Sequence, residues 1–252
     1  METVVVTASA GSFPGLAEAL SGLSLRLEEQ PLINFRPPSD PSSLELAIDR
    51  LSSYGAVALT SPRAARSLAD QVEQRGRAQS SRRAPPTVWA AGAVTAAALR
   101  GTMGEVRTAD LEAAAGGAAG ALADAMIAAR VAGPVLFPCG DRRREELPGR
   151  LRRAGLQVDE VVCYHSILAS ESEAHAVAVR ATLVIVASPS VAQLLIRACP
   201  PGSRPALIAA GSTTAAAALA GGWEPAAVAS QPEAEAVAAA VQKALARRSS
   251  HE

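Results

Sequence analysis

Short runs of apolar, often β-branched residues alternate with longer Ala- and Leu-rich stretches along most of this chain. This alternation is typical of βαβ units, in which helices connect the parallel strands of one sheet. In the middle of the chain the apolar runs predict strands at residues 56–59, 87–90, 105–108, 135–138 and 158–164. The intervening stretches predict helices near residues 64–73, 95–99, 119–130 and 144–154.

The carboxy-terminal part of the chain holds too few strands for a domain of its own. Between residues 182 and 245 the pattern predicts only strands 183–187, 206–210 and 226–229. At the other end, an apolar run at 4–8 and an expected helix near 15–27 form a βα unit without partners nearby. We therefore predict a discontinuous domain, residues 1–30 plus 172–252, into which a second domain, 38–161, is inserted. The connecting segments, 31–37 and 162–171, are short and β-like, and we expect them to pair as a two-stranded linker.

Two segments of the chain occur twice in the same order. Residues 57–65 (VALTSPRAA) match 184–192 (VIVASPSVA), and residues 90–99 match 209–219. The offsets are 127 residues (188 − 61) and 119 residues (211 − 92), about the size of a small domain. The predicted fold is therefore α/β, with two similar domains that are each a parallel β-sheet flanked by helices and that a two-stranded β linker joins.

The repeated segments place hydroxyls and small residues directly after an apolar run. Ser61-Pro62 and Ser188-Pro189 each combine a preferred N-cap with a proline suited to the first helical position. The free N–H groups of such a helix start can bind an anion. For one copy alone, a plain helix start is the simpler interpretation. The turns at Gly92 and Gly211 repeat the arrangement with threonine donors.

Composition narrows the functional classes. The 24 Lys and Arg residues balance 24 Asp and Glu residues, and only 3% of the chain is aromatic, which disfavours a nucleic-acid partner. No apolar run approaches the length of a membrane span, and the amino terminus is typical of a strand and not of a signal peptide. We expect a cytoplasmic protein whose cysteines, Cys139, Cys163 and Cys199, are structural thiols. The histidines are too scattered for a metal site.

Three exposed or linker features leave alternatives open. Arg144 follows an expected strand and a Gly turn and could reach a ligand, whereas Arg142 and Arg143 are expected to face solvent. Tyr164 lies in the expected linker, either as a packed aromatic or as an acid with a donor O–H. The basic segment 75–83 is expected to be a solvated loop, and the polar tail 246–252 to be frayed.

Together these segments resemble the uroporphyrinogen-III synthase family across almost the whole chain. The motifs are LTSPRA at 59–64, GAVTA at 92–96, LFPCG at 136–140 with Arg144 and Leu147, VCY at 162–164, SPS at 188–190 and GSTTA at 211–215. Each motif is weak by itself, but their order and spacing are fairly specific. The chain departs from the family's pattern at 7–9 (TAS), where many bacterial members carry Arg-Pro, and at Pro232-Glu233, where the family tends to carry Pro-Thr.

The resemblance implies an enzyme that closes hydroxymethylbilane to uroporphyrinogen III with inversion of ring D and release of water. It implies an azafulvene and a spiro intermediate, no cofactor and no metal, and a monomer with its active site in a cleft between two domains. The family's tyrosine falls on Tyr164, which would assist the departure of hydroxide. The expected substrate-binding residues are Ser61, Arg63, Thr95, Arg144, Ser188, Ser190, Thr213 and Thr214.

Two other classes of protein compete with this assignment. One is a non-catalytic two-domain protein that binds a small polyanionic ligand, which would have no need of a tyrosine in the linker. The other is a flavodoxin-like regulatory module, but the chain has no clustered acidic pocket after its first strand.

Overall fold

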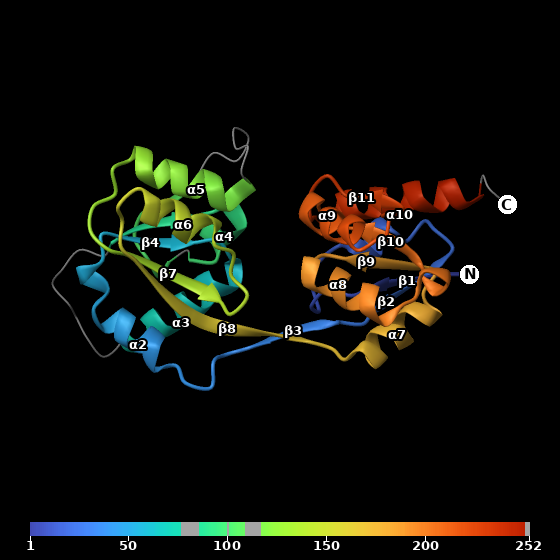
Figure 1. The fold of residues 1–252 in the computed structure, drawn as a ribbon, viewed down its shortest axis with the longest axis horizontal. Coiled ribbons are helices and arrows are strands. Elements are labelled where there is room, and N and C mark those ends of the chain that lie inside the picture. Colours follow the sequence, from blue (N-terminus) through green and yellow to red (C-terminus); the bar gives the residue numbers. More distant parts are fainter. Residues whose placement is uncertain (77–85, 100, 109–116, 250–252) are drawn as a thin grey trace. The chain divides into compact units, whose positions relative to one another are not determined.

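The chain forms two compact α/β units (Figure 1). The computed structural model of the 252-residue chain describes residues 1–76, 86–99, 101–108 and 117–249. Unit 1 consists of Met1–Asn34 and Ile167–Glu252, and unit 2 is Phe35–Ser166. The predicted fold class, parallel sheets flanked by helices in two units, is confirmed. Among the helices of the described ranges, none is long and apolar enough to cross a membrane.

Unit 1 is built on a five-stranded sheet in the order β11-β10-β9-β1-β2, with every neighbouring pair parallel. The strands are β1 (Glu2–Val6), β2 (Leu25–Glu29), β9 (Leu183–Val186), β10 (Ala206–Ala209) and β11 (Ala227–Val228). Helices α1 (Leu16–Ala19) and α10 (Ala234–Ser249) share one core cluster with β1, β9 and β10. Helices α7 (Glu171–Arg180), α8 (Pro189–Ala198) and α9 (Ser212–Ala220) pack side by side in that order, and the 3-10 helix η2 (Pro201–Ser203) follows α8.

The helix expected near residues 15–27 is wrong beyond its first turn. Helix α1 ends at Ala19, and Leu25–Glu29 forms the edge strand β2 beside β1. The leucines at positions 23, 25 and 27 alternate with polar residues, which is a strand period, and charged side chains are typical of an exposed sheet edge. Strand β2 supplies the fifth strand of this sheet, which the sequence analysis lacked.

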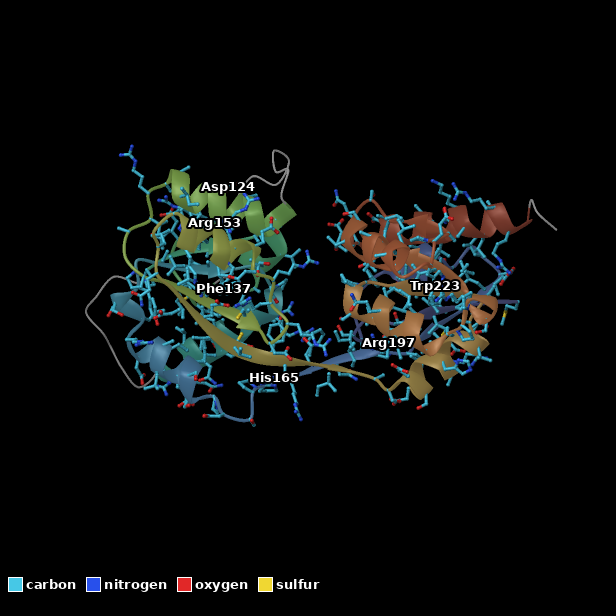
Figure 2. All side chains as sticks on the ribbon, in the orientation of Figure 1. Asp124, Phe137, Arg153, His165, Arg197 and Trp223 are labelled. Carbon is cyan, nitrogen blue, oxygen red and sulfur yellow. The ribbon has the colours of Figure 1, made fainter. Side chains whose placement is uncertain are left out.

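Unit 2 contains a sheet in the order β3-β8-β7-β4-β5-β6, in which the pairs from β8 to β6 are parallel. The strands are β3 (Ile33–Arg36), β4 (Ala56–Leu59), β5 (Thr87–Ala90), β6 (Val106–Thr108), β7 (Val135–Gly140) and β8 (Val158–Leu168). On one face lie α2 (Ser42–Asp49), α3 (Pro62–Gly76) and α4 (Ala93–Ala97), with η1 (Leu51–Ser53) after α2. On the other face α5 (Gly117–Ala128) and α6 (Glu146–Arg153) cover the buried Phe137 of β7 (Figure 2).

The sequence repeat corresponds to a shared strand order. When β4 and β5 are matched to β9 and β10, the order β8-β7-β4-β5-β6 in unit 2 becomes β2-β1-β9-β10-β11 in unit 1. The strands β1 and β2 open the chain, whereas their counterparts β7 and β8 close unit 2, so the two units are circular permutations of one arrangement. Strands β3 and β8 lie next to each other, and each crosses the boundary between the units along the chain.

Two expectations for exposed segments were wrong in part. Arg75, assigned to a loop, lies in α3 and forms ion pairs with Asp49 and, at 2.9 Å, with Glu45. The rest of that expected loop, 77–83, lies outside the described residues. Helix α10 continues to Ser249, so most of the tail expected to be frayed is helical, and residues 250–252 lie outside the described part.

The glycine before β4 fixes how this strand enters the sheet. The Gly55 N–H donates to the Pro134 carbonyl at 2.9 Å, and a Cβ at Gly55 would lie 1.5 Å from the Ala132 carbonyl oxygen. No side chain fits there, so β4 and the segment before β7 would have to separate.

We therefore expect Gly55→Ala to destabilise unit 2. Overpacking of this kind costs about 1–3 kcal/mol or more, which lowers the midpoint of thermal unfolding by at least about 2 °C for a chain of this size. Gly202→Ala is the control, because a Cβ there meets no atom within 4 Å. Equal midpoints for the two variants, measured by circular dichroism, would contradict this account.

Candidate active site

Ser61 closes the turn between β4 and α3, at the carboxyl edge of the unit 2 sheet. Strand β4 lies between β5 and β7, where the strand order reverses, and ligands of open α/β sheets bind at such points. The Ser61 Oγ accepts the N–H groups of Arg63 (3.2 Å) and Ala64 (3.4 Å), as an N-cap does. The Ser-Pro pair therefore starts a helix at Pro62, as predicted.

The second Ser-Pro pair forms an equivalent cap in unit 1. The Ser188 Oγ accepts the Val191 N–H at 3.4 Å, and α8 begins at Pro189. The Ser190 hydroxyl lies 2.6 Å from the Ser188 Oγ, so the two hydroxyls form one polar group at the start of α8. Both side chains are half-buried and both reach the surface of unit 1.

Tyr164 of β8 lies next to the Ser61 cap within unit 2. Its hydroxyl donates to the Ser61 Oγ at 3.3 Å. The ring rests against the backbone at the end of β7, where a Cβ on Gly140 would lie 2.5 Å from two ring carbons and 2.8 Å from the phenol oxygen. An irregularity between Cys139 and Gly140 shifts the β7–β8 register and pairs Gly140 with Tyr164. Only glycine at position 140 therefore leaves room for the Tyr164 ring where it is observed.

The surroundings of Tyr164 keep its phenol protonated. Burial of the side chain raises the pKa of Tyr164 above its usual value of 10.0, while the hydrogen bond to Ser61 and the Arg63 guanidinium oppose only part of that increase. At neutral pH the residue is therefore a neutral donor, and the O–H can be directed to a ligand in place of the Ser61 Oγ.

Arg63 is stacked beside this tyrosine. Its guanidinium carbon lies 3.7 Å from the centre of the Phe35 ring and 5.9 Å from the centre of the Tyr164 ring. The Phe35 and Tyr164 rings meet edge to face at 5.7 Å. Burial lowers the pKa of Arg63, although an arginine stays charged at neutral pH. No carboxylate in the described ranges forms an ion pair with it.

The three arginines after β7 differ in their partners. Arg143 is exposed, as expected, and also forms ion pairs with Glu160 and, at 2.5 Å, with Glu145. Arg142 and Arg144 are exposed, and Arg144 has no ion pair to a carboxylate of the described ranges. The structure therefore leaves Arg144 available at the surface of unit 2.

Thr95 and Thr214 are almost fully buried residues. These residues occupy equivalent positions in α4 and α9, and their exposed fractions are 3% and 2%. Each is the third residue of its helix, and most of each side chain packs toward the sheet. In unit 1 the neighbouring Thr213 is exposed, whereas its counterpart Val94 is an exposed apolar residue.

The polar residues after β1 form hydrogen bonds within unit 1. The buried Thr7 hydroxyl donates to the Ile185 carbonyl at 2.8 Å, and Ser9 and Ser12 bond each other. The turn that departs from the family's pattern is therefore closed by its own hydrogen bonds.

Phe35 and Gly140 are contacts of Tyr164 that the sequence analysis missed. Phe35 lay in the expected linker 31–37 and Gly140 in the LFPCG motif, but nothing in the sequence placed either against Tyr164. A third missed contact is Asp141, whose N–H donates to the Tyr164 carbonyl at 3.1 Å. Its carboxylate accepts the Ser166 N–H at 2.8 Å and lies 3.6 Å from the His165 ring nitrogen. This carboxylate fastens β8 just after Tyr164.

The three cysteines are buried thiols, and Cys163 precedes Tyr164 in β8. All three are free and buried, as expected for structural thiols, and burial raises the pKa of Cys139 to about 11 and of Cys163 to about 12. Within the ranges that the structure describes, no cluster of His, Cys, Asp and Glu side chains is arranged to hold a metal ion.

Comparisons with known proteins place this geometry in a family. A family model described as Uroporphyrinogen-III synthase HemD matches residues 15–239. No curated protein matches the chain. Among solved structures, a mutant uroporphyrinogen III synthase from Thermus thermophilus is 14% identical with a TM-score of 0.66, over 98% of this chain and 100% of that one. Uroporphyrinogen-III synthetase from Helicobacter pylori is 18% identical with a TM-score of 0.64, over the same shares.

The two kinds of comparison establish different things. At such low identity the solved structures establish the fold alone, whereas the family model spans most of the chain, from helix α1 to helix α10. The chain therefore belongs to the uroporphyrinogen-III synthase family, the cyclising lyases of heme biosynthesis whose substrate is hydroxymethylbilane.

Proposed function

We propose that Tyr164 is the acid of this enzyme and that turns from both units hold the carboxylates of hydroxymethylbilane. The phenol donates its proton as the C–O bond of the ring A hydroxymethyl group breaks, so that water leaves and a protonated azafulvene forms, in which ring A keeps its N–H. The substituted carbon of ring D attacks this azafulvene, and the resulting spiro intermediate fragments and closes again with ring D inverted. The proton that ring D loses at the end returns to the phenolate, which restores the acid.

The observation that carries this proposal is the protonated phenol at the start of α3. Tyr164 combines a raised pKa, a hydrogen bond to Ser61 and a cation, Arg63, within 5.9 Å of its ring. The cation and the helix start both stabilise negative charge that develops on the phenol oxygen as the proton leaves. The chain's other tyrosine, Tyr54, also has a pKa raised by burial and lies 5.8 Å from the Arg50 guanidinium, but its hydroxyl donates to the Asp159 carboxylate and not to a helix cap.

The proposed carboxylate contacts come from hydroxyls, arginines and backbone N–H groups. We assign them to Ser61, Arg63 and Arg144 in unit 2, and to Ser188, Ser190 and Thr213 in unit 1. Thr95 and Thr214 are omitted because so little of either residue is exposed. At their turns we assign the carboxylate contacts to backbone N–H groups.

A weak acid and many binding contacts suffice for this chemistry. Hydroxymethylbilane can close by itself to the symmetric isomer, so the protein's main task is to direct attack to the other carbon of ring D. Holding reacting groups in the correct geometry is worth several kcal/mol without a strong catalytic group. We also propose that the enzyme works as a cytoplasmic monomer, as the family resemblance implies, and its free thiols agree with a reducing compartment.

Tyr164→Phe tests the proposed acid. We expect the wild type to convert fresh hydroxymethylbilane to the type III isomer, and Tyr164→Phe to lower kcat on the order of a hundredfold, as loss of a general acid does. Tyr54→Phe removes the chain's other phenol from the same unit and should leave kcat near that of the wild type. Products are resolved by chromatography after oxidation. Type I isomer alone from the wild type would reject the enzyme assignment, and an unchanged kcat for Tyr164→Phe would leave that residue a packing role.

Gly140→Ala tests the position of the phenol without removing it. The added methyl group overlaps the Tyr164 ring, so we expect the ring to move away from Ser61 and kcat to fall at least about tenfold, since small misplacements are costly in catalysis. The control is Gly149→Ala in α6 of the same unit, where the nearest atom to a new Cβ is 3.5 Å away. Its kcat should not change. If both variants retained full activity, the contact between Tyr164 and Gly140 would not contribute to catalysis.

The raised pKa of Tyr164 predicts the alkaline side of the pH profile. The phenol loses its proton only above its usual value of 10.0, so the active, protonated form persists through pH 9. We expect kcat for type III formation to show no alkaline fall between pH 7 and 9 that depends on this residue. A fall in that range that is present in the wild type and absent from Tyr164→Phe would show that the tyrosine ionises earlier.

A further inference from the structure

A small cavity of about 140 Å³ opens beside Tyr164 within unit 2. Its walls come from β3, α3 and β8, and its lining includes Phe35, Arg36, Arg63, Ser67, Cys163 and Tyr164. Two of these residues are cations, and none of the residues that line the cavity is acidic. The cavity therefore offers positive charge and hydroxyl donors next to the proposed acid.

Arg63 is held in a fixed plane at this cavity. Stacking at 3.7 Å on Phe35 covers one face of the guanidinium and leaves its N–H edge free to donate. A planar guanidinium edge matches a carboxylate, with which it can form two parallel hydrogen bonds. A half-buried cation without a counter-ion is costly, so the arrangement favours an anion beside it.

Several other arginines of unit 2 have a carboxylate partner, whereas Arg63 has none among the described residues. Arg75, Arg143, Arg150 and Arg152 each form an ion pair with an Asp or Glu of the same unit. Arg36 and Arg63 have no such partner among the residues described, although both line one cavity. Arg66 and Arg144 also form no ion pair with a carboxylate of the described residues, but neither of them lines this cavity. Arg36 and Arg63 are the two arginines among its lining residues.

We infer that this cavity is a carboxylate-binding pocket that receives one acetate or propionate side chain of hydroxymethylbilane. Arg63 and Arg36 bind the carboxylate, and Phe35 positions the Arg63 guanidinium. The inference rests on the proposed function and goes further, because it assigns a particular pocket, and two residues not included above, to one arm of the substrate.

The size of the cavity agrees with a single arm. Its volume equals that of roughly four or five water molecules in the liquid, at about 30 Å³ each. An acetate or propionate arm fits into that space. The arm would place its pyrrole at the mouth of the cavity, beside the Tyr164 hydroxyl.

Charge-neutral variants test the pocket against general attraction of the substrate. We expect Arg63→Gln to raise KM about tenfold or more, since a lost charge-assisted hydrogen bond is worth that much, and to lower kcat as well, because the cation beside Tyr164 is lost. Arg36→Gln should raise KM several-fold, with kcat within about twofold of the wild type. Arg66→Gln is the matched control, because Arg66 lies one turn along α3, is exposed and does not line the cavity. Its KM should stay within about twofold of the wild type.

Variants of Phe35 test the positioning role separately. Phe35→Leu removes the stacked ring and should raise KM a few-fold, as expected for a lost cation–π contact, while Phe35→Tyr should restore the wild-type KM. Thermal unfolding confirms that each variant is folded, and the exposed Arg36 provides a variant that does not disturb the core.

The outcomes separate this inference from the proposed function. If the wild type forms no type III isomer, the proposed function fails. If the wild type forms it and Arg63→Gln and Arg36→Gln behave like Arg66→Gln, the pocket fails alone. A fall in kcat at unchanged KM for Arg63→Gln would also overturn the pocket, because the arginine would then act only on Tyr164.

Discussion

The close approach of the Tyr164 ring to the Gly140 backbone is the contact on which the candidate site depends. Because residue 140 has no side chain, the ring can lie flat at the end of β7 and bring its hydroxyl to the Ser61 cap. The same position puts the ring edge to face with Phe35, which in turn supports Arg63. Partial burial then keeps the phenol protonated. One missing methyl group thus determines where the proton donor, the helix start and the cation meet.

The two units share a strand order but differ in the chemistry of their carboxyl edges. In unit 1 the turns after β9 and β10 present hydroxyls, with Ser188 and Ser190 bonded to each other. In unit 2 the corresponding turn after β4 adds Arg63, and β8 adds a phenol that its counterpart β2 lacks. Neutral donors can bind any carboxylate with little preference, whereas a stacked cation and an acid at one place distinguish one end of a substrate. The same strand order thus carries hydroxyl donors at the carboxyl edge of unit 1, and a cation with a phenol at the carboxyl edge of unit 2.

Local signals explain what could be predicted from the sequence. Strands β4 and β5 were predicted to the residue because buried parallel strands are continuous apolar runs, and the Ser-Pro caps were recognisable because a cap acts on the next few residues. Strand β2 was missed because an edge strand with Arg26 and Glu28 resembles an amphipathic helix in composition. The burial of Thr95 could not be predicted, since it depends on how helix α4 packs on the sheet. The pairing of Gly140 with Tyr164 could not be predicted either, since it depends on the register between β7 and β8.

The site contains little that would identify an enzyme from side chains alone, and the chemistry accounts for this. When the uncatalysed reaction already forms a ring, selectivity depends on which carbon of ring D is held near the azafulvene, and that is decided by the fixed positions of the carboxylate arms. Long arginine side chains lose much conformational entropy when they bind. Stacking Arg63 on Phe35 incurs that loss during folding and not during binding. In the proposed pocket, the apolar side chain of Phe35 thus acts on the substrate by positioning Arg63.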